Sequence, residues 1–116
     1  MEYEKARDLG HMLKSGLRRL NEKMVPHEPV PTSEFVSFID SLSQGILPDG
    51  DPYYGVLAGG SMEGMTYGRH PDGSETAYYD VVTPRTNTKL AFPVTRSALG
   101  EFEVGKPIII DLRDSK

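Results

Sequence analysis

Residues 62–82 read MEGMTYGRHPDGSETAYYDVV, and this stretch indicates the fold more clearly than any other. Its two outer segments contain Tyr, Thr and Val, which favour strands. Between them, residues 70–74 (HPDGS) include Pro-Asp-Gly, in which the proline sets φ and the glycine tolerates a positive φ. The stretch therefore predicts a β-hairpin with strands over 62–69 and 75–83.

The remainder of the second half predicts further short strands between turn residues, over 53–58, 89–95, 101–104 and 107–112. Strand starts every 8–12 residues are typical of an antiparallel meander or small barrel rather than of βαβ units. Pro93 lacks an N–H donor, so its strand should lie at an edge or contain a bulge.

The end of the chain contains three consecutive isoleucines, at 108–110. Such an apolar run predicts a strand that is buried on both faces. The sequence FEVGKPIIIDL is similar to a hairpin of SH3-like or OB-like barrels, a likeness of fold that implies no function.

The first half of the chain predicts two helices. Apolar residues recur at helical spacing over 3–24, and Gly10 and Gly16 on the same broad face suggest close packing of another element. This helix packs either within the chain or against a second copy. A proline-rich linker follows at 25–31, and a second helix is expected over 32–45, with Thr32 as N-cap and Gly45 as the C′ residue. The whole chain thus predicts one α+β domain over 1–116, with a five- or six-stranded antiparallel sheet or partial barrel.

Length and composition limit the structural and functional classes to which this chain can belong. The 116 residues suffice for one domain with a modest core, and the absence of cysteine excludes disulfides and thiolate metal sites. The net charge of −4 argues against non-specific nucleic-acid binding, which needs clustered cations. No apolar run has signal-peptide or membrane-spanning length, so a soluble cytoplasmic protein is expected.

One row of basic residues follows the first helix at positions Arg7, His11, Lys14 and Arg18. Such a row is suited to phosphates or an acidic partner. The simpler interpretation, which we prefer to a binding role, is that this row is a solvated helix face.

Candidate catalytic groups are few. The segment Gly59–Gly64 lacks the Walker spacing and a nucleophile elbow, so a glycine-rich turn is the simpler interpretation. His70 and Asp72 lie in a turn, where a general-base role lacks a surrounding cleft. His27 with Glu28, and Asp49 with Asp51, do not make a convincing metal site. The sequence therefore predicts no catalytic set, no metal and no cofactor.

Tyrosines give the strongest functional indication. Adjacent rings in a strand point to opposite faces, so one of Tyr53 and Tyr54, and one of Tyr78 and Tyr79, should leave the core. Exposed aromatic rings beside cations are suited to protein anchoring or base stacking. The predicted binding residues are Tyr53, Tyr54, Tyr67, Arg69, Tyr78, Tyr79, Arg85 and Lys89.

Three functions follow from this pattern. The leading hypothesis is a non-catalytic binding module, regulatory or structural, whose tyrosine-bearing sheet face binds a protein partner and whose helix 3–24 offers a surface for self-association. The first alternative is single-stranded nucleic-acid binding on a small barrel, with Arg96 joining the cations on the backbone. The second alternative is a small-ligand binder or small enzyme that uses the region 59–75, with Ser61, His70 and Asp72 as its polar groups.

Overall fold

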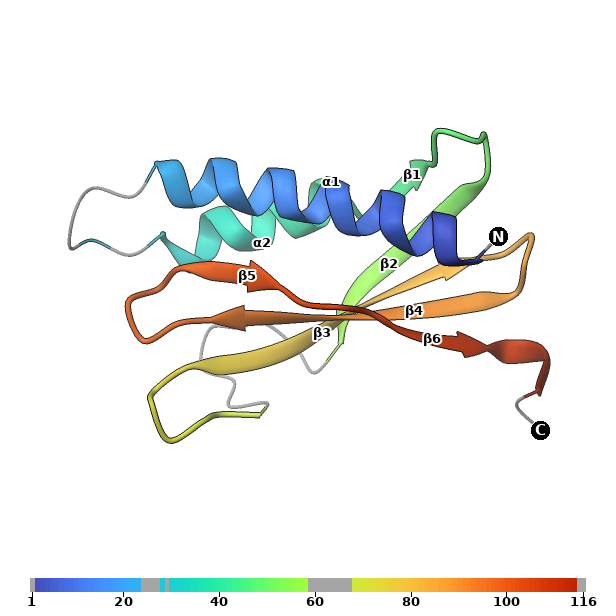
Figure 1. Ribbon diagram of the computed structural model, residues 1–116. Coiled ribbons are helices and arrows are strands. Elements are labelled where there is room, and N and C mark those ends of the chain that lie inside the picture. The colour runs from blue at the N-terminus through green and yellow to red at the C-terminus, as the bar shows by residue number, and fades with distance from the viewer. Residues whose placement is uncertain (1, 24–27, 29, 59–67, 115–116) are drawn as a thin grey trace.

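The computed structural model describes residues 2–23, 28, 30–58 and 68–114 of the chain. In this part, two helices precede an antiparallel sheet and lie on the same side of it (Figure 1). The sheet order is β1-β2-β3-β4-β5, with β6 also paired to β4, and the sheet curls into a half-barrel. The predicted α+β architecture is confirmed. The elements are α1 (Glu2–Glu22), α2 (Thr32–Ser41), β1 (Gln44–Ile46), β2 (Pro52–Ala58), β3 (Glu75–Thr83), β4 (Thr88–Arg96), β5 (Phe102–Val104), β6 (Ile108–Asp111) and the 3-10 turn η1 (Leu112–Asp114).

Helix α1 packs its apolar stripe against the sheet of the same chain. Leu9, Leu13 and Leu17 are only 2–3% exposed and belong to the core that also contains the inner residues of β3 and β4. Each buried leucine contributes about 1.5–3 kcal/mol to folding relative to an exposed one. Packing within the chain therefore occupies this stripe, and self-association would have to use another surface. None of the described helices is both long and apolar enough to cross a membrane.

The glycines of α1 mark close packing, as the sequence predicted. A Cβ added at Gly16 would lie 2.1 Å from Cε1 of Phe38 in α2, so only glycine admits that ring. A Cβ added at Gly10 would lie 3.5 Å from Cε1 of Phe92, which is an ordinary contact distance. The two glycines therefore differ: Gly16 is required for helix packing, whereas Gly10 has room beside it.

Helix α2 is shorter than the sequence predicted and is capped differently. Pro31 rather than Thr32 occupies the N-cap, and its carbonyl accepts hydrogen bonds from the amides of Glu34 and Phe35. The helix ends at Ser41, and Gly45 lies in β1 instead of serving as the C′ residue. The pairing of β1 with β2 overrides the local C-cap signal, because it satisfies backbone groups that a longer helix would leave unpaired.

The predicted strands correspond to β2, β3, β4, β5 and β6, and the three-residue β1 was not predicted. The predicted strand 62–69 lies outside the described residues except for 68–69, which belong to no strand. The turn after it has the expected chemistry: Gly73 has φ +89°, and the His70 amide donates to the Ser74 carbonyl at 2.8 Å. Residues 75–83 form β3 with the predicted bounds.

Pro93 lies in β4, which is an interior strand, so its predicted edge position is wrong. Val94 pairs with Val104 and Ala91 with Ile108, so two residues of β4 face the three residues 105–107. The extra residue lies in the segment opposite β4 and not in the strand of Pro93, where the bulge was predicted. The proline is tolerated because β5 and β6 are interrupted opposite it, so no hydrogen bond from a backbone N–H is needed at this position. Its carbonyl accepts a hydrogen bond from the Gly105 amide at 2.9 Å.

The isoleucines of β6 also differ from the prediction. Ile108 is 55% exposed and Ile109 is 42% exposed, whereas burial on both faces was expected. The physical reason is position: β6 pairs only with β4 and forms an edge of the sheet among the described strands. An apolar run alone does not show whether a strand lies at the centre or at the edge.

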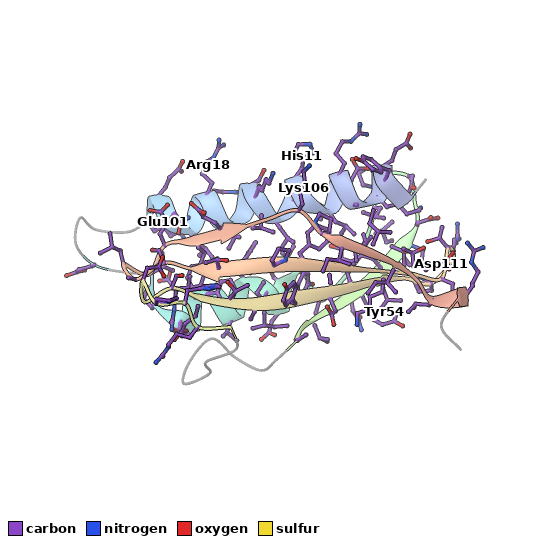
Figure 2. The ribbon with its side chains drawn as sticks, turned by 60° about the horizontal axis from the view of Figure 1, so that its bottom comes forward. His11, Arg18, Tyr54, Glu101, Lys106 and Asp111 are labelled. Atoms are coloured by element: carbon purple, nitrogen blue, oxygen red, sulfur yellow. The ribbon has the colours of Figure 1, made fainter. Side chains whose placement is uncertain are left out.

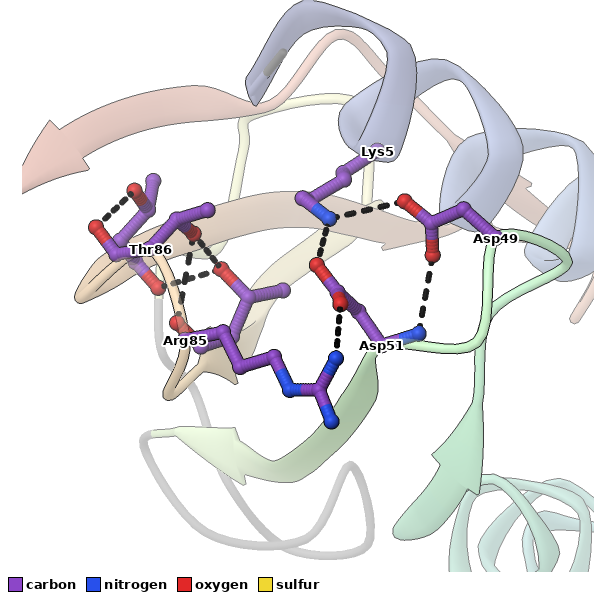
Figure 3. A network of polar contacts seen from close by, with 7 residues as sticks. Lys5, Asp49, Asp51, Arg85 and Thr86 are labelled. Carbon is purple, nitrogen blue, oxygen red and sulfur yellow. Dashed lines mark hydrogen bonds and ion pairs between the residues drawn. The ribbon is translucent and has the colours of Figure 1, made fainter.

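A buried ion-pair cluster joins the start of α1 to the turn between β1 and β2 (Figure 3). The Lys5 ammonium donates to Asp49 Oδ2 at 2.9 Å and to Asp51 Oδ2, although 44 and 46 residues separate these partners. Lys5 is 5% exposed, and hydrogen bonds from its ammonium to Asp51 and Asp49 raise the pKa of Lys5. Arg85 approaches the other oxygen of Asp51 at 3.2 Å. The cluster positions the N-terminal turns of α1 over the sheet.

Candidate functional site

One candidate surface is the outer face of the sheet, opposite the helices. Side chains alternate along each strand, and directly paired residues share a face. Tyr54, Val82, Lys89 and Ile110 therefore form one row across β2, β3, β4 and β6. A second row contains Val56, Asp80, Ala91 and Ile108, and a third contains Ala58, Tyr78 and Pro93. We call these three rows the outer sheet face. Figure 2 shows Tyr54 on the side of the sheet away from α1.

The tyrosines divide between the two faces as the alternation predicted. Tyr53 and Tyr79 are 5% and 1% exposed and belong to the core, so they do not lie on the outer sheet face. The Tyr79 hydroxyl donates to the Leu42 carbonyl at 2.8 Å, and burial raises the pKa of both phenols. Tyr54 is 49% exposed and Tyr78 is half-buried, both on the outer sheet face.

Apolar side chains dominate the exposed parts of this face. Val56 is 65% exposed and Ile108 is 55% exposed, and they lie at opposite ends of the same row. Between them, the carboxylate of Asp80 pairs with the Lys89 ammonium at 3.2 Å. The face therefore combines apolar margins with a central charge pair that has no net charge.

The other predicted cations do not form a continuous basic patch. Arg69 and Arg96 both pair with Glu75, each at 2.7 Å, and Arg85 pairs with Asp51. Arg96 also donates to the Thr32 hydroxyl at 2.9 Å, so it lies on the helix side of the sheet. Pairing with carboxylates reduces the positive potential that phosphate binding requires. Tyr67 lies outside the described residues.

The pairing of Glu75 predicts a pH-dependent contribution to stability. Hydrogen bonds from Arg69 and Arg96 lower the pKa of the buried Glu75 carboxyl below its usual value of 4.5, with Arg69 the larger cause. A lowered folded-state pKa stabilises the fold above the unfolded-state pKa, and this contribution is lost as the pH falls through the folded-state pKa. Glu75→Gln should therefore lower the free energy of unfolding by about 1–2 kcal/mol at pH 7.

The difference between wild type and Glu75→Gln should begin to shrink as the pH falls below about 4.5, where unfolded Glu75 takes up a proton, and it should be lost as the pH falls through the lower folded-state pKa. Urea unfolding of both proteins at a series of pH values from 7 to 3 measures this difference. A difference that stayed constant over that range would contradict the assigned ion pairs.

The region proposed for catalysis does not assemble a reactive set among the described residues. His70 Nε2 lies 2.9 Å from the Thr76 hydroxyl, and Asp72 accepts hydrogen bonds from the amide and hydroxyl of Ser74. These bonds lower the pKa of Asp72 and stabilise the turn. Residues 59–67, which include Ser61 and the whole glycine-rich segment Gly59–Gly64, lie outside the described residues. In the described ranges, no group of three or more His, Asp or Glu side chains is placed to hold a metal ion.

Sequence reasoning missed Val56 and Ile108, which are the most exposed apolar groups of the face. Alternation places Val56 on the same face as Tyr54, but it does not say whether that face or the face of Tyr53 is the exposed one. Ile108 had no sequence signal, because its exposure depends on β6 lying at the sheet edge. Comparison with known protein families, with curated proteins and with solved structures finds no match to this chain.

Proposed function

We propose that this chain is a non-catalytic protein-binding module whose outer sheet face binds a second copy of the same chain. The observation that carries the proposal is the shared exposure of Tyr54, Val56 and Ile108 on one face of the sheet. Covering such side chains removes apolar surface from water and favours association by about 25 cal/mol per Å² before the costs of binding.

Charge complementarity favours a second copy as the occupant. Asp80 and Lys89 are neighbours at the centre of the face and carry opposite charges. When the two-fold axis of a symmetric contact passes between Asp80 and Lys89, Asp80 of one copy lies near Lys89 of the other and the converse, because each residue pair occurs twice. The apolar margins on β2 and β6 then cover one another. Two sheets packed face to face in this way are separated by about 10 Å.

The alternatives have weaker support. Nucleic-acid binding would use Arg69, Arg85, Lys89 and Arg96, each of which has a carboxylate partner. A small-ligand site or small enzyme in the region 59–75 would need groups beyond the hydrogen-bonded turn around Asp72. The outer sheet face therefore provides the better-supported function.

Light scattering of the full chain over a range of concentrations tests the proposal. Wild type is expected to form dimers, and Val56→Glu should raise the dimer dissociation constant at least about tenfold, because it buries an unpaired charge. Leu99→Glu is the matched control, since Leu99 is 77% exposed in the turn between β4 and β5, outside this face. A wild type that stays monomeric, or equal weakening by both variants, would overturn the proposal.

A charge exchange tests the two-fold geometry separately. Asp80→Lys alone should weaken dimerisation because it places like charges together, and the double variant Asp80→Lys/Lys89→Asp should restore it. Circular dichroism checks that the variants remain folded. Failure of the double variant to recover dimerisation would exclude this arrangement. Salt-sensitive binding of a labelled single-stranded oligonucleotide by monomers would instead favour the nucleic-acid alternative and overturn the proposal.

A further inference from the structure

A cavity of about 280 Å³ lies between α1 and the segment that joins β5 to β6. Figure 2 shows His11, from α1, next to Lys106, from this segment. The cavity exists partly because Gly10 has no side chain, and the ring of Phe92 lies beneath it. It opens on the helical side of the sheet, so it is separate from the outer sheet face.

The cavity has apolar walls that are accessible to a ligand. Tyr3 is 80% exposed and Ile109 is 42% exposed, and both line it together with Pro107. These two residues are among the large apolar side chains that the core leaves uncovered. A ligand with an apolar body would cover them and gain the corresponding hydrophobic free energy.

Basic side chains surround these walls. Arg7, His11, Lys14 and Lys106 line the cavity, and none of its described lining residues carries a carboxylate. Among the described residues, neither Lys14 nor Lys106 has a carboxylate within ion-pair distance, whereas Arg7 lies 3.8 Å from Asp8. This local excess of positive charge contrasts with the net charge of −4 of the whole chain. It therefore favours an anionic group at the rim.

The excess of positive charge is confined to the cavity beside Gly10 and does not continue along α1. The next hollow along the helix is lined by Glu101 and Glu103 as well as by Lys14 and Arg18, so it has no excess of positive charge. A long acidic partner that followed the whole helix would meet these two glutamates and be repelled. The charge pattern therefore fits a small anion better than an extended acidic peptide.

We propose that the cavity binds a small organic anion that has an apolar body and a single carboxylate head. A volume of about 280 Å³ is near the lower end of small-molecule sites. A ligand of about ten non-hydrogen atoms therefore fits. Its apolar body lies against Tyr3, Pro107 and Ile109, and its carboxylate lies near Lys14 and Lys106.

Octanoate is the probe, because it combines a tail of suitable size with one carboxylate. Calorimetric titration of the full chain is expected to show saturable binding of octanoate, and NMR should localise the shifted amides to α1 and residues 105–109. 1-Octanol tests the tail without the charge, and acetate tests the charge without the tail. Both should bind at least about fivefold more weakly than octanoate.

Two variants separate the roles of charge and space. Lys106→Glu should weaken octanoate binding about fivefold or more. Lys23 is exposed and follows the last residue of α1, far from the cavity, so Lys23→Glu should leave octanoate binding unchanged. Gly10→Leu should abolish binding by filling the cavity, and the helix should tolerate it because leucine favours helices.

Absence of saturable octanoate binding, equal binding of 1-octanol, or unchanged binding by Gly10→Leu would each overturn the inference. Binding of acetate as strong as that of octanoate would also overturn it, because the apolar walls would then contribute nothing. Dimerisation is measured separately by light scattering, so failure of this test is distinguishable from failure of the sheet-face proposal.

Discussion

Phe35→Ala is expected to lower the free energy of unfolding by about 3–5 kcal/mol, the range for deletion of a fully buried aromatic ring. Phe35 is 0% exposed and stacks on Phe102, with ring centroids 4.1 Å apart and planes inclined by 6°. The contact joins α2 to β5, so its loss leaves a cavity between the helices and the sheet. For a domain of this size, the change is a large share of the total stability of about 5–15 kcal/mol. Urea unfolding measures it.

Phe38→Ala is the matched control for this prediction. Phe38 lies one turn further along the same helix and is only half-buried, beside Gly16. Its truncation should cost about half as much, because the surrounding solvent fills part of the space. Equal losses for the two variants, or a loss below about 1 kcal/mol for Phe35→Ala, would contradict the core described above.

Asp51→Ala is expected to lower the free energy of unfolding by about 2–3 kcal/mol. The Asp51 side chain is 15% exposed and accepts from Lys5, whose own side chain is 7% exposed. Its removal leaves a buried ammonium with only Asp49, a more solvated partner with a side chain 51% exposed. Asp49→Ala should therefore cost less than Asp51→Ala. Thermal or urea unfolding at pH 7 compares the two variants.

A double-mutant cycle tests whether the buried charge is the cause. Lys5→Met removes the ammonium and keeps an apolar side chain of similar length, so Lys5→Met/Asp51→Ala should lose less than the two single variants added together. Additive losses would show that Lys5 and Asp51 act independently, which would contradict the cluster shown in Figure 3.

Several elements could be predicted from the sequence because they depend on local signals. The leucine spacing of α1 and the alternation in 75–83 match the periods of a helix and a strand, and both elements have nearly the predicted bounds. The Pro-Asp-Gly turn forms with the expected positive φ at Gly73. Adjacent tyrosines also had to occupy opposite faces, although alternation could not say that Tyr53 and Tyr79 were the buried ones.

Other features depended on which strand lies beside which. Pro93 is tolerated in an interior strand because the neighbouring strand is interrupted opposite it, and the isoleucines of β6 are exposed because that strand is at an edge. The end of α2 was misjudged for a related reason, since Gly45 pairs in β1. In each case, the local residue preference was outweighed by backbone pairing with a distant segment.

Residue periodicity and turn chemistry thus specify the helices, most strands and the alternation of faces, because these properties involve neighbours within a few positions along the chain. The Lys5–Asp51 ion pair, the exposure of Val56 and Ile108 on one face, and the cavity beside Gly10 arise from contacts between segments far apart in the sequence. Such contacts exist only once the sheet has its register and α1 lies on it, and no single stretch of residues encodes them.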